Sequence, residues 1–252
     1  MNMKTSELVA WLDDYLDIRG FDDSSLNGLQ VEGKDEVDKV VLAVDASYNT
    51  FESAVARGAD LIIVHHGLFW GAEQPITGPL RQRLAYLLEH DVNLYAAHLP
   101  LDAHQEVGNN WGLARILGLE DVQGFRYLGA KPLGCHGRFP EPVGLHALAE
   151  AIEKALGEQV MVHAGGPDPV STLGIISGGA AREVASAHAA GLDAFLTGEP
   201  KHDTFYESYE RGVSSLFAGH YMTETVGVKL LAEKLEAVFG LDAEFVMLPT
   251  GL

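Results

Sequence analysis

Histidines and carboxylates follow four short apolar segments of this 252-residue chain. In chain order, the residues that come after these segments are His65 and His66, His98 and Asp102, Glu199 and His202, and His220 and Glu224. The segments have the apolar composition and length that are typical of buried strands in a parallel sheet. Because ligands bind beyond the carboxyl ends of such strands, we expect a functional site there.

The adjacent histidines His65 and His66 constrain the geometry of such a site. Consecutive side chains of a strand point to opposite faces, so the two imidazoles cannot share a site while both residues are extended. We therefore expect the strand to end before them and the backbone to turn at Gly67.

Two other pairs of these residues are separated by four positions. A helix that begins at the second pair would place His220 and Glu224 on one face, where their side chains are neighbours. Asp102 also comes four residues after His98, but Pro100 lies between them. We expect this proline to keep the stretch out of a helix.

The side chains at these strand ends offer nitrogen and oxygen ligands for a metal ion, and no thiolates. The only cysteine, Cys135, excludes a disulfide framework and a thiolate cluster, and we expect it to be a buried thiol. Imidazoles and carboxylates suit zinc, manganese, iron, nickel or cobalt and do not select among them. Three imidazoles and two carboxylates exceed what one tetrahedral ion takes from protein, whereas two metal ions accommodate them in the manner of metal-assisted hydrolysis.

Other polar features of the sequence are expected to be structural. The glycine-containing segment 174–180 lacks the dinucleotide fingerprint and the P-loop lysine, so it predicts a tight turn. Single histidines are usually solvated or hydrogen-bonded, and we expect this of His90, His104, His136, His146, His163 and His188.

Strand and helix patterns alternate along the chain, which predicts an α/β fold with mainly parallel sheets covered on both faces. Apolar runs predict strands at 39–44, 61–64, 93–97, 214–218 and 244–248. Helical spacing of apolar residues predicts helices at 8–16, 50–57, 80–88, 111–117 and 226–239.

The two halves of the chain are similar. Segments 56–67 and 189–200 align without gaps, each with a glycine, then an aspartate, then a short apolar strand. We expect a first α/β unit at 1–125 and a second at 126–252, divided in the polar, glycine-rich segment 117–132, and leave open a crossing back of the chain. The first would carry His65, His66, His98 and Asp102, and the second His220 and Glu224.

The overall composition excludes several classes of protein. Lysine and arginine total 17 against 36 aspartates and glutamates, so the formal charge is −19 and a general nucleic-acid binder is excluded. No apolar run approaches the roughly 20 residues that a membrane span needs, and the N-terminus lacks a signal-peptide core. We expect a soluble, cytoplasmic protein.

Six motifs spread over nearly the whole chain connect it to a known family. They are NGLQ at 27–30, VDAS at 44–47, LIIVHHGLFW at 61–70, AAHLPLDA at 96–103, LTGEPKH at 196–202 and GHYMTE at 219–224. With these motifs the sequence resembles the NIF-three-like family, whose bacterial members are labelled as homologues of a type 2 GTP cyclohydrolase I.

The resemblance implies a dinuclear metal centre with two divalent ions. Its ligands would be His65, His66, Asp102, His220 and Glu224, with Glu224 touching both ions. The resemblance also implies two interlinked α/β domains and a homohexameric ring.

Two functions follow as expectations. The first is a metal-dependent hydrolase for a small nucleotide, which would open the purine ring of GTP at C8 while His98 or Glu199 shuttles protons. The second is a non-catalytic metal-binding protein that regulates a partner or supports an assembly. Turnover that is lost in a folded Glu224→Ala variant would separate the two.

Overall fold

The computed structural model describes residues 3–252, which divide into two compact α/β units. The first unit comprises residues 1–101 and 227–248, and the second comprises residues 102–226 and 249–252. Each unit is built from two separate segments of the chain, so the units are interlinked, as expected. The α/β class with parallel strands at the centre of each large sheet is confirmed.

The first unit is built around a five-stranded sheet in the order β13-β4-β5-β6-β2. The strands of this sheet are β2 (Gly28–Val31), β4 (Lys39–Asp45), β5 (Leu61–His66), β6 (Asn93–Ala96) and β13 (Asp242–Phe245), and β1 (Met3–Lys4) and β3 (Glu36–Val37) form a separate antiparallel pair. Its helices are α1 (Thr5–Tyr15), a 3₁₀ turn (Ile18–Gly20), α2 (Tyr48–Ala56), α3 (Gly78–Glu89) and the start of α4 (Leu99–Ala103). Strands β13, β4, β5 and β6 run parallel, and β2 is antiparallel to β6.

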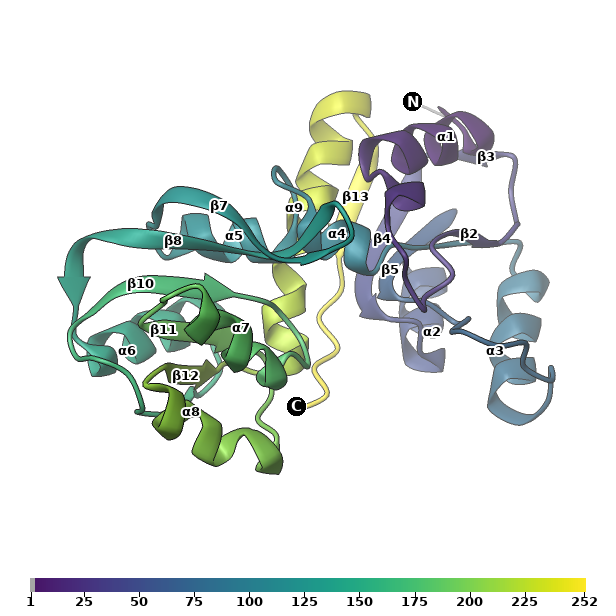
Figure 1. Ribbon diagram of the computed structural model, residues 1–252. Helices are drawn as coiled ribbons and strands as arrows, with labels where there is room; N and C mark the ends of the chain where they lie inside the picture. Colours follow the sequence, from purple (N-terminus) through teal and green to yellow (C-terminus); the bar gives the residue numbers. More distant parts are fainter. Residues whose placement is uncertain (1–2) are drawn as a thin grey trace. The chain divides into compact units, whose positions relative to one another are not determined.

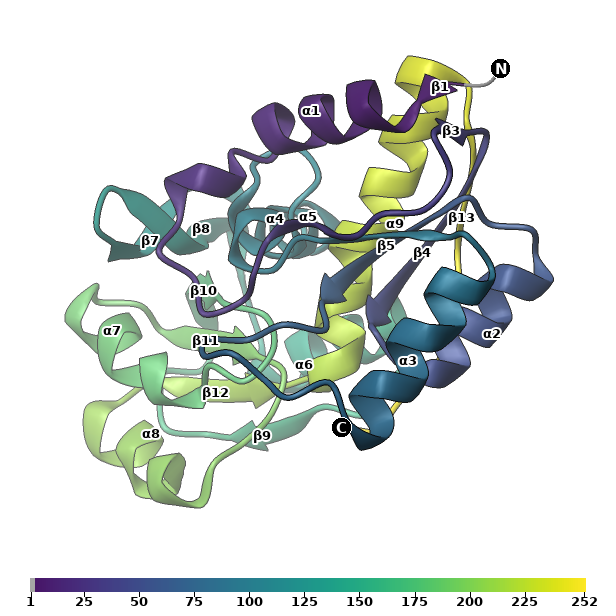
Figure 2. The ribbon, with the colours of Figure 1, turned by 90° about the vertical axis from the view of Figure 1, so that its right-hand side faces the viewer.

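Helices cover both faces of this sheet (Figure 2). Phe51 of α2 and Leu87 of α3 pack against the buried side chains on one face. On the other face, the Tyr95 hydroxyl of β6 donates to Asp13 of α1 over 3.0 Å. Two buried apolar layers therefore fix the carboxyl ends of β4, β5 and β6 beside one another.

The second unit is built around a six-stranded sheet in the order β7-β8-β10-β11-β12-β9. Its strands are β7 (Glu120–Leu128), β8 (Lys131–Val143), β9 (Met161–His163), β10 (Val170–Ile175), β11 (Ala194–Thr197) and β12 (Ser214–Phe217). Its helical elements are α5 (Asn109–Ile116), α6 (Leu145–Leu156), α7 (Val184–Ala189), α8 (Phe205–Arg211), 3₁₀ turns at Ala181–Glu183 and His202–Thr204, and the start of α9 (His220–Phe239). Strands β10, β11 and β12 are parallel, and β7, β8 and β9 add antiparallel edges (Figure 1 and Figure 2).

The expected division of the chain at residue 126 differs from these units in three places. Segment 117–132 is not a linker: it contains β7, the turn at Gly129 and the first residues of β8, which together begin a long antiparallel hairpin. Much of β7 is exposed, so its polar composition resembles that of a linker. Asp102 belongs to the second unit, and β13 pairs with β4 in the first.

The expected helices and strands are confirmed, with shifts at their ends. Helix α9 begins at His220 rather than at 226, and β5 continues through His66 rather than ending at 64. The expectation that Pro100 prevents a helix is wrong, because it lies in the first turn of α4. A proline is tolerated there, since the first N–H groups of a helix need no intrahelical partner.

The two aligned segments are the same structure in both units. Helix α2 ends before β5, and α7 ends before β11, as the alignment of 56–67 with 189–200 predicts. Gly58 and Gly191 both have positive φ, 78° and 69°. Each glycine allows the left-handed turn that ends its helix.

None of the helices formed by residues 3–252 has the length and apolar character needed to cross a membrane.

Candidate functional site

His65 and His66 are the last two residues of β5, and their imidazoles lie close together. Their ring centroids are 4.7 Å apart. The expectation that extended neighbours cannot share a site is therefore wrong. Strand alternation fixes only the Cα–Cβ directions, whereas each imidazole extends beyond its Cβ and reaches an acceptor on a neighbouring strand or at its end.

Different acceptors hold these two rings. Nδ1 of His65, a fully buried residue, lies 3.0 Å from the carbonyl oxygen of Ala97, which follows β6. Nδ1 of His66 lies 2.9 Å from Oδ1 of Asp45, the last residue of β4. A carbonyl or carboxylate can only accept, so Nδ1 of each ring carries a hydrogen, and in the neutral ring Nε2 then has the lone pair.

His98 joins the two histidines as a third imidazole of the first unit. Its ring centroid is 5.1 Å from that of His65 and 5.6 Å from that of His66. The ligand atoms that these three residues offer all lie within 4.8 Å of one another. The indole of Trp70 lies edge-on to His98, with the ring centroids 4.9 Å apart. This cluster can bind a cation through imidazole nitrogen.

Asp23 fixes the ring of His98 from behind. Its Oδ1 and Oδ2 lie 2.9 and 3.1 Å from Nδ1 of His98. Burial raises the pKa of Asp23, but the His98 hydrogen bond and charge, with the Asn27 and Ser25 donors, lower the pKa to about 2. Asp23 is therefore ionised at neutral pH.

The NGLQ motif supports this cluster through its two amides. Asn27 donates from Nδ2 to Asp23 and accepts the His98 N–H at Oδ1, over 2.9 and 2.7 Å. Gln30 accepts the Leu68 N–H at Oε1 over 2.7 Å and so holds the turn after β5. These contacts give the motif a structural role in positioning the histidines.

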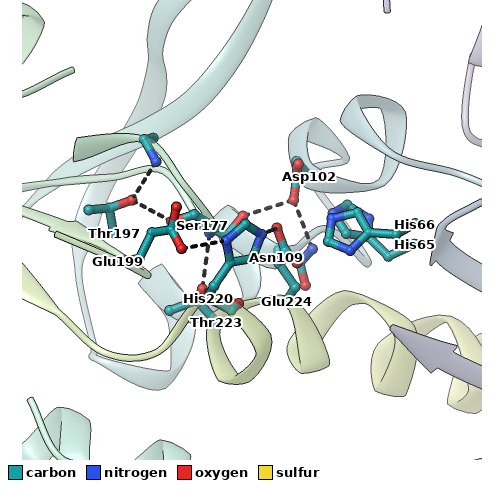
Figure 3. Close-up of polar contacts among 12 residues, drawn as sticks. His65, His66, Asp102, Asn109, Ser177, Thr197, Glu199, His220, Thr223 and Glu224 are labelled. Atoms are coloured by element: carbon teal, nitrogen blue, oxygen red, sulfur yellow. Dashed lines mark hydrogen bonds and ion pairs between the residues drawn. The ribbon is translucent and has the colours of Figure 1, made fainter. Parts of the chain in front are cut away.

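His220 and Glu224 face one another on the first turns of α9 in the second unit. Nε2 of His220 lies 3.2 Å from Oε1 of Glu224, and Nδ1 lies 3.3 Å from Oε2 of Glu199 (Figure 3). The Glu224 hydrogen bond is the main cause that raises the pKa of His220 to about 9; burial opposes it and Glu199 adds to it. The expected placement of His220 and Glu224 on one helix face is confirmed.

Gly178 brings the backbone close to this pair. Its N–H donates to Oγ1 of Thr223 over 3.0 Å, and its φ is +65°. A Cβ at this position would overlap Oε1 of Glu224 and lie 3.2 Å from Nε2 of His220. Strand β10 ends at Ile175 and the chain bends at Gly178 and Gly179, so this segment forms part of the surroundings of Glu224.

Asp102 is held by two donors of the second unit. Its Oδ1 accepts from Nδ2 of Asn109 and from Oγ of Ser177, both over 2.8 Å (Figure 3). The residue is 6% exposed, so these donors compensate a carboxylate that has lost most of its water. Asp102 thus presents a fixed carboxylate in the second unit.

The structure adds supporting residues that the sequence did not indicate. Asp45 could have been found, because it also ends a strand of the parallel sheet. Asp23, by contrast, lies 75 positions from His98 in a polar loop, where nothing in the local pattern marks it. The remaining additions are Asn109 and Ser177, which donate to Asp102, and Thr223 of α9, which accepts from the Gly178 N–H.

Cys135 and His163 lie away from the histidines and carboxylates described above, and the sequence predicts structural roles for both. Cys135 is a free, buried thiol whose pKa burial raises to about 12, so the expectation of a buried thiol is confirmed. His163 departs from the expectation of a solvated or hydrogen-bonded side chain. It is buried between Phe205 and Phe217, and its Nδ1 has no hydrogen-bond partner among residues 3–252.

Comparisons with known proteins agree over nearly the full length. A family model described as Duf34/NIF3 (NGG1p interacting factor 3) matches residues 3–250. A Deinococcus radiodurans protein named GTP cyclohydrolase 1 type 2 homolog is 48% identical over 246 residues, covering 98% of this chain and 94% of the relative. The crystal structure of TTHA1606 from Thermus thermophilus is 50% identical with a TM-score of 0.90, covering 99% of this chain and 100% of that one. The structure titled "protein ybgI, unknown function" is 41% identical with a TM-score of 0.93 and the same coverage.

Proposed function

Because the chain belongs to the Duf34/NIF3 family, whose matched relatives are named GTP cyclohydrolase 1 type 2 homolog, we propose that it is a dinuclear metal-binding protein acting as a metal-dependent hydrolase. The observation that carries the proposal is the pair of imidazoles of His65 and His66, with His98 beside them. Nδ1 of His65 and Nδ1 of His66 each bond to an acceptor outside this pair, which leaves the lone pair of each neutral ring on Nε2. Imidazoles fixed by such outer partners are the usual nitrogen ligands of transition metals.

The proposal assigns five ligands to two divalent ions. These ligands are His65, His66, Asp102, His220 and Glu224. Three imidazoles, each neutral once it binds a metal ion, and two carboxylates would offset only half of the charge of two divalent ions. The remaining positive charge would favour an anionic substrate despite the formal charge of −19.

The reaction proposed is hydrolysis of a small nucleotide such as GTP. Bound divalent ions would supply Lewis acidity, which polarises a substrate oxygen and makes water more acidic. His98 is the proposed acid/base: its Nε2 would accept a proton from the attacking water and return it to the leaving group. Asp23 would stabilise the imidazolium that forms in between, because it is a buried, ionised carboxylate.

The family resemblance also supports a proposal for the oligomeric state and the location of the protein in the cell. We propose that the protein assembles as a homohexamer and acts in the cytoplasm.

The test is incubation of the metal-loaded protein with GTP, monitored for formate release and ring opening, with and without a chelator. We expect turnover that the chelator abolishes. His98→Ala should keep its metals and slow the reaction by about 10²–10⁴, the usual range for a lost acid/base. With both metals loaded, absence of metal-dependent turnover would overturn the cyclohydrolase reaction and favour the non-catalytic binding role.

A further inference from the structure

We propose that Asp23 is a positioning residue that holds His98 in the tautomer protonated on Nδ1 and thereby keeps a lone pair on Nε2 beside His65 and His66. The inference rests on the proposed function only for the use of that lone pair, because the tautomer itself is a property of the first unit. It identifies a residue that the five-ligand assignment does not contain.

Asp23 is built to remain an ionised acceptor. Its side chain is 2% exposed. Oδ1 accepts the Ser25 N–H over 3.0 Å, and Oδ2 accepts from Nδ2 of Asn27 and from the Leu99 N–H over 2.9 and 3.0 Å. With only donors around it, this carboxylate can face His98 in one way, by accepting from a protonated Nδ1.

The ring of His98 is fixed at several points. Both oxygens of Asp23 lie within 3.1 Å of Nδ1, and Asn27 holds the His98 backbone N–H. Trp70 lies edge-on to the imidazole, and the rings of His65 and His66 occupy neighbouring positions. The ring therefore keeps one orientation, and Nε2 is left to accept a hydrogen bond from water or from a substrate hydroxyl.

Asp23 differs from the other carboxylate that contacts the cluster. Asp45 bonds to Nδ1 of His66 through a single oxygen, and its side chain is 36% exposed. Asp23 is enclosed, uses both oxygens and also bonds the backbone next to His98. A buried group that accepts from several fixed donors tolerates replacement poorly, since any new donor at its position would meet another donor.

Substitution by asparagine tests this requirement. Whichever way the amide of Asp23→Asn is oriented, its NH₂ would face either the Ser25 N–H or the Asn27 and Leu99 donors. We expect the enforced tautomer to be lost. Asp45→Asn is the matched control, because it changes the carboxylate of the neighbouring His66 and leaves Asp23 in place.

The measurement is the nuclear magnetic resonance spectrum of the histidine ring nitrogens, recorded on the metal-free, full-length protein at a pH where the rings are neutral. The His98 signals are assigned by their absence from His98→Gln. We expect His98 of the parent to show a protonated Nδ1 and an unprotonated Nε2. In Asp23→Asn this pattern should change to Nε2–H or to a tautomer mixture, whereas in Asp45→Asn it should stay as in the parent.

Two results would overturn the inference: a parent protein with His98 protonated on Nε2, or an Asp23→Asn spectrum identical to that of the parent. The first needs no variant, so misfolding of Asp23→Asn cannot obscure it. Metal content and turnover are measured separately. Failure of the hydrolase proposal would leave the tautomer result intact, and an overturned tautomer would leave metal binding unaffected.

Discussion

Asp60 and Asp193 perform the same structural task in the two units. Oδ2 of Asp60 accepts the N–H groups of Asp38 and Lys39 over 3.0 and 3.1 Å, where β4 begins. Oδ2 of Asp193 accepts the N–H groups of Ser171 and Thr172 over 2.8 and 2.9 Å, in β10. Each aspartate precedes the next strand of its sheet and so ties two neighbouring parallel strands together.

We expect Asp60→Ala and Asp193→Ala each to lower the free energy of unfolding by about 1–3 kcal/mol, because two backbone N–H groups lose their acceptor. Asp60→Asn and Asp193→Asn keep one carbonyl oxygen and should lose less. Urea unfolding of the four variants measures the difference. Equal losses for alanine and asparagine would show that the two backbone hydrogen bonds do not carry the effect.

Gly178 should be far less tolerant of a side chain than Gly191. Both residues have positive φ, +65° and +69°, so both alanine variants pay a similar backbone penalty of about 1–2 kcal/mol. Only Gly178→Ala places a Cβ against Glu224, whereas a Cβ on Gly191 meets nothing within 4 Å. We expect the extra loss of stability to be about 1–3 kcal/mol, the range for overpacking. Thermal unfolding checks it, and equal losses in both variants would contradict it.

The metal assignment predicts close to two transition-metal ions per chain in protein purified without a chelator. His65→Ala and Glu224→Ala should each lose metal and remain folded, because each removes one donor from an otherwise intact unit. Elemental analysis gives the metal content, and circular dichroism reports the fold. His188→Ala, at an exposed position of α7, is the control. Parent-like metal content in both donor variants would refute the assignment.

His163 should make the protein sensitive to acid. Burial lowers its pKa, so the unfolded chain takes up a proton on this ring at a higher pH than the folded protein does. The stability that depends on neutral His163 is therefore present above the unfolded pKa of about 6.5 and decreases as the pH falls toward the lower folded value.

Replacement of His163 by leucine removes both this titration and a buried nitrogen that has no hydrogen-bond partner in the described part of the chain. We expect His163→Leu to lose less stability than the parent between pH 7 and pH 5, measured by urea unfolding at each pH. His188→Leu changes an exposed histidine and should follow the parent. Parallel pH profiles for the parent and His163→Leu would contradict this prediction.

The sequence by itself determined the elements and the chemical types at their ends. Apolar runs define buried strands, because burial on both faces requires apolar side chains at every position, and parallel strands bring their carboxyl ends to one edge. That reasoning placed His65, His66 and His98 at neighbouring strand ends, and the first unit has them there. The spacing of His220 and Glu224 likewise fixed their contact, since four residues make one helical turn.

Only the tertiary structure decided which groups hold these side chains. Asp23 meets His98 across 75 positions of sequence, and Ser177 meets Asp102 across the same separation. Such pairs depend on how packed elements bring distant loops together, and no local periodicity records that. The same holds for β13, which pairs with β4 from the far end of the chain, and for β7, whose exposed residues made a strand resemble a linker. The local sequence places the histidines and carboxylates at the ends of their strands and helices. Their orientation, and with it the tautomer of each histidine, comes from the packing of the whole unit.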